Sequence, residues 1–149
     1  MHVRPTRATA RIEGHAIACL LSAVRAQHGL PGLRSNAPLA RAARAHSRDM
    51  VRRHYFGHGS PAGSTMTGRV LRTGYLRGAH AWEIGETLAW ATGSSATPAA
   101  FVASWLRSAE HRAILLDPSY RQVGVGLALG LPDGERRGAT LTADFGVKR

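Results

Sequence analysis

At 149 residues the chain has the length of one domain, and its single cysteine, Cys19, excludes an intrachain disulfide, so packing must hold the fold. The formal net charge of +11 comes almost entirely from arginine, because Lys148 is the only lysine. The arginines are scattered and aromatic residues do not alternate with them, which argues against a nucleic-acid partner but leaves association with an anionic surface open. No run approaches the ~20 apolar residues of a transmembrane segment.

The N-terminal part of the chain predicts a short disordered segment followed by a helix. Residues 1–10 are basic and poor in apolar side chains, so we expect disorder there and one domain over 11–149. Apolar residues at i, i+3, i+4 and i+7 predict an amphipathic helix over about 11–28, which Gly29 ends. This stripe, and Arg25 where a small-residue cleavage site would be needed, argue against a secretion signal.

The rest of the chain predicts more helices and then two strands. Asn36 and Thr97 are good N-caps, each followed by a proline in the first helical turn. A glycine- and serine-rich loop over 55–65 precedes a short helix over about 66–73. Alternating apolar residues over 123–129 and 141–147, separated by a Pro-Asp-Gly turn, predict a hairpin. We therefore expect an α+β fold with helices on both sides of a small antiparallel sheet.

Three short segments each present one ionisable side chain. His58 lies in the loop Tyr55–Pro61, Glu86 begins an apolar run, and His111 follows an amphipathic helix. Two imidazoles and a carboxylate from three places could form a metal site or an acid–base site. No close pair such as H-E-x-x-H arranges them in advance, so their spacing alone does not decide between the two.

These segments, with the helical stretches Leu20–Leu30 and Ala45–Met50, follow in an order that resembles the CAP superfamily. This family comprises the cysteine-rich secretory proteins, antigen 5 and pathogenesis-related 1, its domain is also called SCP, and the resemblance is to its compact bacterial branch. It implies a three-layer α-β-α sandwich with an open cleft that holds two histidines and two acidic residues.

The resemblance assigns positions in that cleft. His58 and His111 match the two histidines and Glu86 matches one acid, whereas Ser108 occupies the position of the second acid. Thr87 stands where the family usually has asparagine. A mechanism that needs two carboxylates, or tight metal binding by four side chains, is therefore not implied.

Each site residue has a functional and a structural interpretation. His58 and His111 could bind zinc or another divalent ion, or they could be ordinary cleft histidines that bond to the backbone. Glu86 could act in the site or fix the loop that carries His58. Burial would raise its pKa, whereas an imidazolium or a metal would lower it. His46 could be a satisfied core histidine or, with Thr87, a partner that surrounds and orients the cleft residues.

Three functions remain possible at this stage. The first is a binding module, extracellular or in the cell envelope as the family implies, whose cleft takes a divalent cation or a small ligand such as a lipid or cell-wall component. The second is a hydrolase with His58 or His111 as base and Glu86 orienting it, although no G-x-S-x-G elbow is present. The third is a basic adhesion or structural domain. Whether the protein is an enzyme stays open.

Overall fold

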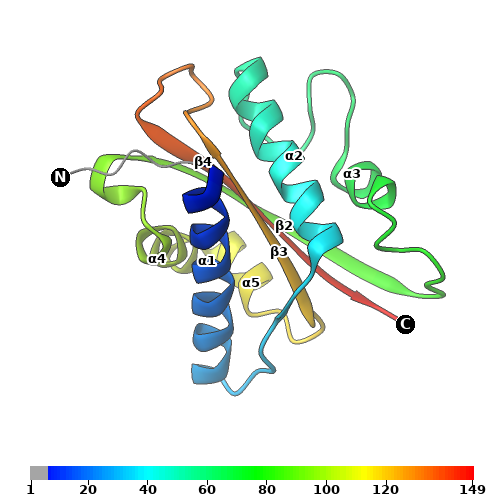
Figure 1. The fold of residues 1–149 in the computed structure, drawn as a ribbon. Helices are drawn as coiled ribbons and strands as arrows, with labels where there is room; N and C mark the ends of the chain where they lie inside the picture. The colour runs from blue at the N-terminus through cyan, green and yellow to red at the C-terminus, as the bar shows by residue number, and fades with distance from the viewer. Residues whose placement is uncertain (1–6) are drawn as a thin grey trace.

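The computed structural model describes the backbone of residues 7–149 and the side chains from residue 13 onward. Within these residues, five α-helices pack around a single sheet of four strands (Figure 1). The elements are α1 (Arg7–Gln27), β1 (Arg34–Ser35), α2 (Ala37–Arg53), α3 (Met66–Arg72), β2 (Trp82–Thr92), the 3-10 turn η1 (Gly93–Ser95), α4 (Pro98–Arg107), α5 (Ala109–Leu115), β3 (Gln122–Leu129) and β4 (Gly138–Lys148).

The sheet has the strand order β1-β3-β4-β2. The predicted hairpin is confirmed, since β3 and β4 pair antiparallel with Leu127 opposite Leu141. β2 pairs antiparallel with the other side of β4 and places Glu86 opposite Asp144. The sheet is not purely antiparallel, because the two residues of β1 pair in parallel with β3. The sequence analysis did not predict β2.

The predicted helix starts agree with the structure except at the N-terminus. The Asn36 side chain accepts a hydrogen bond from the Leu39 amide at 3.0 Å, and Thr97 caps α4 in the same way. Residues 7–10, expected to be disordered, belong to α1, which is consistent with the high helix propensity of alanine and arginine in this stretch. Residues 1–6 of that expectation lie outside the described residues.

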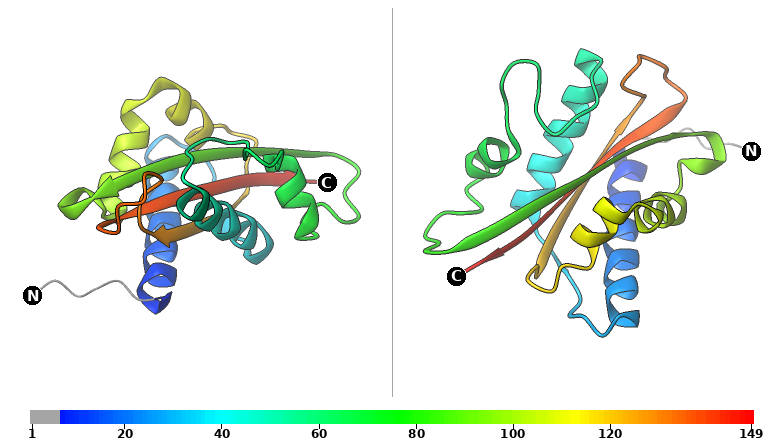
Figure 2. Two further views of the ribbon diagram at one scale, coloured as in Figure 1. Left: turned by 90° about the horizontal axis from the view of Figure 1, so that it is seen from above. Right: turned by 180° about the vertical axis from the view of Figure 1, so that it is seen from behind.

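One face of the sheet packs on α1, α4 and α5 and carries the larger apolar core (Figure 2). Odd-numbered strand residues point to this side, because successive side chains in a strand alternate between faces. The fully buried members from the helices and strands include Ile17, Leu21, Trp105, Leu141 and Phe145.

The opposite face lies under α2 and α3 and combines a smaller apolar cluster, which includes Leu39 and Val70, with buried polar groups. Gly124 and Gly126 of β3 lie directly against the α2 backbone, where a Cβ on either glycine would overlap it. The neighbouring positions of β4 and β2 on this face hold buried polar side chains, namely Thr140, Thr142, Asp144 and Glu86. The expected three-layer α-β-α arrangement is therefore present, and Glu86 and Asp144 are buried between the sheet and α2–α3.

Candidate functional site

The best-defined polar contact joins His58 to Glu86. His58 lies in the loop between α2 and α3, and its Nδ1 is 2.7 Å from Glu86 Oε1. The His58 side chain is 60% exposed whereas that of Glu86 is 1% exposed. A carboxylate can only accept a hydrogen bond, so Nδ1 carries the hydrogen and donates a hydrogen bond to Glu86. The other ring nitrogen, Nε2, has no hydrogen-bond partner among the described residues and carries the lone pair when the ring is neutral.

Two buried side chains fix the backbone on which His58 sits. His46 on α2 donates from Nε2 to the Gly57 carbonyl at 2.9 Å. Arg69 on α3 donates from Nη2 to the His58 carbonyl at 2.8 Å. An exposed loop histidine is thereby held in one orientation by both the sheet and the covering helices.

Arg69 also forms the ion pair that keeps Glu86 charged. Its Nη2 lies 2.8 Å from Glu86 Oε2 and 3.1 Å from Oε1, and the Arg69 side chain is 7% exposed. Burial raises the pKa of Glu86, but the hydrogen bonds from His58 and Asp144 and the charge of Arg69 outweigh it and hold that pKa below its usual range. Glu86 is therefore a carboxylate at neutral pH.

Asp144 of β4 lies directly across the ladder from Glu86 and is 1% exposed. No donor among the described residues reaches either of its carboxyl oxygens. Burial, the charge of Glu86 and the hydrogen bond to Glu86 raise the pKa of Asp144 well above its ordinary value. Two facing carboxyl groups can hydrogen-bond only if one is protonated, and the raised pKa favours Asp144 as the protonated one.

His46 fits both interpretations of its role. It is buried and bonds to the loop backbone, as a satisfied core histidine would. Its Nε2 also lies 3.9 Å from Glu86 Oε1, and its Nδ1 lies 3.4 Å from the Tyr55 hydroxyl, which donates to Asp49 at 2.8 Å. Burial lowers the pKa of His46 more than Glu86 raises it, so this ring is neutral.

The remaining predicted site residues do not join this cluster in the described residues. Ser108 lies at the junction of α4 and α5, His111 lies on α5, and neither bonds to His58 or Glu86. α5 packs on the other face of the sheet, where Ile114 lies against Gly85. Strand alternation places Thr87 on that face too, so it does not surround Glu86 as expected.

The arrangement can present a single oriented imidazole to a ligand. A histidine whose Nδ1–H is bound to a carboxylate offers a basic Nε2 to a proton, a metal or a hydrogen-bond donor. The hydrogen bond to Glu86 raises the pKa of His58, although burial opposes it. Both oxygens of Glu86 are already bound, which makes Glu86 a partner of His58 rather than a metal ligand. No group of three or more His, Cys, Asp or Glu side chains in the described residues could hold a metal ion.

Arg69 and Asp144 are the site residues that sequence reasoning missed. Arg69 is one of the many arginines of the chain, it lies in a short helix, and nothing in the local sequence pattern distinguishes it from the others. Asp144 occupies a polar position in an alternating strand, which predicts exposure to solvent. The available signal was Gly124 and Gly126 on the neighbouring strand, because paired small residues on one face indicate close helix packing.

A family model matches most of the chain. The model described as the cysteine-rich secretory protein family, CAP, matches residues 20–137. The membrane protein YlbC of Bacillus subtilis is 36% identical over 108 residues, which cover 72% of this chain and 29% of YlbC. This chain thus spans less than a third of that relative's length.

Two solved bacterial structures have the same fold. An extracellular protein containing an SCP domain from Bacillus anthracis superposes with a TM-score of 0.74 at 28% identity, covering 97% of this chain and 44% of that one. An outer surface protein from Borrelia burgdorferi has a TM-score of 0.74 at 16% identity and covers 99% and 98% of the two chains, which shows a common fold. Among residues 7–149, no helix has both the length and the apolar character required to cross a bilayer.

Proposed function

Because the chain belongs to the CAP family of cysteine-rich secretory proteins, we propose that it is a ligand-binding module whose site is the Nε2 atom of His58. The observation that supports this is the 2.7 Å hydrogen bond from His58 Nδ1 to buried Glu86, which leaves Nε2 at the surface. A carboxylate that orients a histidine in this way is the usual support of a metal-binding imidazole.

The ligand we propose is a divalent cation such as zinc, with water or a small envelope-derived molecule in its open positions. His58 would supply the protein ligand. His111 lies on α5, which packs on the opposite face of the sheet, so the titration also tests whether this histidine takes part at all. Arg69 neutralises the charge of Glu86, so the buried groups add no net negative charge that would strengthen cation binding. We therefore expect exchangeable binding, with a micromolar rather than a nanomolar dissociation constant.

A calorimetric titration of the metal-free protein with zinc at neutral pH tests this proposal. The His58→Ala/His111→Ala variant should lose a binding event of about one equivalent. The matched control is His28→Ala/His80→Ala, which removes two exposed histidines elsewhere and should bind as the unaltered protein does. Equal binding by all three proteins would show that neither His58 nor His111 is a ligand.

Hydrolysis is the second candidate, because a carboxylate–imidazole pair is also the arrangement of a general base. No serine, threonine or cysteine side chain in the described residues bonds to His58, so water would be the nucleophile. Turnover of a peptide, ester or glycan should then disappear in His58→Ala and in Glu86→Gln. Activity that survives in both variants would eliminate this candidate.

We also propose that the protein acts outside the cytoplasm. This rests on the extracellular protein and the outer surface protein among the similar structures, and on the membrane protein among the relatives. Fractionation of cells that express the native gene, with detection of the protein in culture medium, envelope and cytosol, tests it. Recovery in the cytosol alone would contradict it.

A further inference from the structure

The outer side of α2 carries a row of four arginines. Arg41, Arg44, Arg48 and Arg52 follow at i, i+3, i+7 and i+11, which places them on one side of the helix. We call these four residues the arginine stripe. At a rise of 1.5 Å per residue the stripe is about 16 Å long. It faces away from Glu86 and His58 and is independent of the site proposed above.

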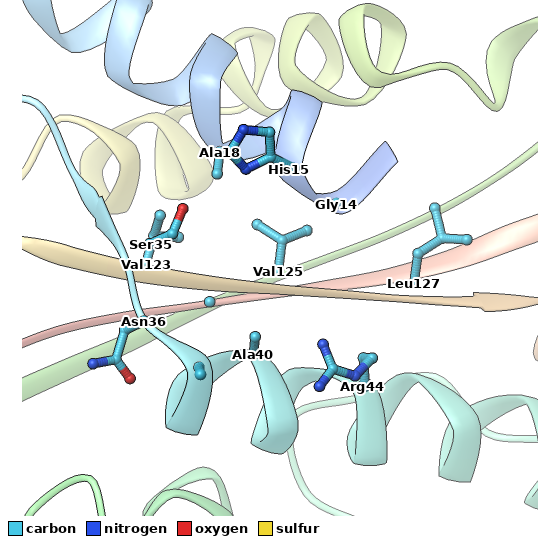
Figure 3. Close-up of a pocket in the computed structure, with 12 residues that line it drawn as sticks. Gly14, His15, Ala18, Ser35, Asn36, Ala40, Arg44, Val123, Val125 and Leu127 are labelled. Carbon is cyan, nitrogen blue, oxygen red and sulfur yellow. The ribbon is translucent and has the colours of Figure 1, made fainter. Parts of the chain in front are cut away.

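The stripe borders a hollow between α2 and the end of β3. The hollow has a volume of about 1160 Å³, and residues of β3 contribute apolar surface, including Leu127 and the 41% exposed Leu129. A smaller hollow of about 350 Å³ lies between α1 and α2 over β3 (Figure 3). Arg44 and Leu127 line both, so the two hollows form one groove along β3.

The positive charge of this groove is not neutralised from within. Among the described residues, Asp49 is the only acidic one that lines the larger hollow, against the four arginines. Its carboxylate already accepts from Arg52, Arg53 and Tyr55. Arg41 donates to the Thr73 carbonyl, Arg44 also has a contact of its own, and Arg48 is exposed. An anion entering the groove therefore meets an excess of guanidinium groups.

We propose that this groove binds a linear phosphodiester polymer without bases, of the poly(glycerol phosphate) type. Guanidinium groups bind phosphate oxygens through paired N–H donors, and a row of them suits a chain with repeated phosphates. The apolar surface of β3 can contact the carbon backbone of such a polymer. In the part of the chain that the structure describes, no phenylalanine, tyrosine or tryptophan side chain lines either hollow, so these hollows lack the row of large rings on which a single-stranded nucleic acid stacks.

The experiment measures binding of a synthetic, fluorescently labelled poly(glycerol phosphate) by anisotropy at several salt concentrations. The test variant is Arg41→Gln/Arg48→Gln. The matched control is Arg107→Gln/Arg112→Gln, which removes the same charge from α4 and α5. Arg107 and Arg48 are both exposed, while Arg112 and Arg41 each donate to one backbone carbonyl, so the two pairs are closely comparable.

The stripe variant should bind about tenfold more weakly than the control, as expected where two exposed ion pairs are lost. Its dependence of log K on log salt should be shallower by roughly one per arginine removed. Equal weakening in both variants would show that binding depends on the net charge of the protein and not on the arginine stripe, which would overturn the proposal. Equal or tighter binding of a single-stranded oligonucleotide, or binding only to phosphatidylglycerol vesicles, would overturn it in favour of another partner.

Discussion

Replacing Arg69 with methionine tests the physical account of the polar cluster most directly. The substitution keeps the length and apolar stem of the side chain but leaves the buried Glu86 carboxylate without its cation. Breaking a buried ion pair on one side costs about 3–5 kcal/mol. We expect a loss of about 3 kcal/mol, the lower end of that range, because His58 still donates to Glu86. That is a large part of the roughly 5–15 kcal/mol typical of a domain.

Urea unfolding at pH 7, followed by tryptophan fluorescence, measures this loss. Trp105 is buried, and its indole donates to the Leu88 carbonyl of β2 at 2.9 Å, so it reports on the strand that carries Glu86. The double variant Arg69→Met/Glu86→Gln removes the negative charge of Glu86 together with its cationic partner. It should be more stable than Arg69→Met by about 1 kcal/mol or more, since residues in one network couple by roughly 0.5–3 kcal/mol.

The pH dependence supplies an internal control on the same variant. In the native protein the pKa of Glu86 is lowered, so its contribution is complete above about pH 4.3 and is lost as pH falls through the folded pKa. In Arg69→Met that pKa should rise, and protonation of Glu86 should reduce the deficit as pH falls below neutrality. If Arg69→Met lost less than about 1 kcal/mol at pH 7 and the double variant were no more stable than the single one, the Arg69–Glu86 ion pair would not contribute to stability as expected.

Three further predictions concern neighbouring groups. Because the pKa of Asp144 is raised, the free energy of unfolding should fall as pH rises above about 4, and urea titrations of Asp144→Asn should lack this fall; equal slopes would contradict a protonated Asp144. The raised pKa of His58 implies a contribution complete below about pH 6.5 and lost as pH rises through the folded value. NMR titration should show this pKa lowered in Glu86→Gln, and an unchanged value would break the proposed link. Gly126→Ala should cost about 3 kcal/mol or more, because its Cβ would overlap the α2 backbone. The control is Gly32→Ala, because a Cβ at Gly32 would make only ordinary contacts. Similar melting temperatures for the two variants would contradict the predicted overlap at Gly126.

The starts of α2 and α4 were predictable because they depend on local chemistry, whereas α5, which carries His111, was not predicted. Asn36 and Thr97 cap their helices through bonds to residues three positions along, and such bonds can be inferred from the local sequence. The hairpin was predictable for the same reason, since its strands alternate and a short turn joins them. The first helix was predicted to start too late, because its basic first turn was interpreted by charge rather than by helix propensity.

β2 was missed because a site residue interrupts its pattern. Trp82, Ile84, Leu88 and Trp90 alternate with smaller residues, as strand residues do, but Glu86 occupies the central apolar position. A carboxylate at a buried position contradicts local preference and is tolerated only because distant residues pair with it. The same residue that revealed the site therefore concealed the strand that carries it.

The partners of Glu86 could not be predicted, since they depend on how three elements meet. Arg69 reaches Glu86 only because α3 packs over β2, and Asp144 does so only through the register of β2 and β4. The family resemblance placed Ser108 at the position of the second acid, whereas in the structure the second carboxyl group near Glu86 is that of Asp144 on β4. The existence of a His58–Glu86 pair was thus foreseeable, but the group that sets its charge was not.

The protonation of Asp144 bears on which ligand the site can hold. If both acids were ionised, the cluster would carry a net negative charge and favour a divalent cation strongly. With Asp144 neutral and Arg69 balancing Glu86, the buried groups sum to zero, and the affinity for a cation must come from the lone pair of His58. Zinc affinity should therefore change little in Asp144→Asn and fall about 10–100-fold in Glu86→Gln, where the support of the imidazole is weakened. Equal losses in the two variants would mean that the carboxyl groups attract the metal by charge rather than by orienting His58.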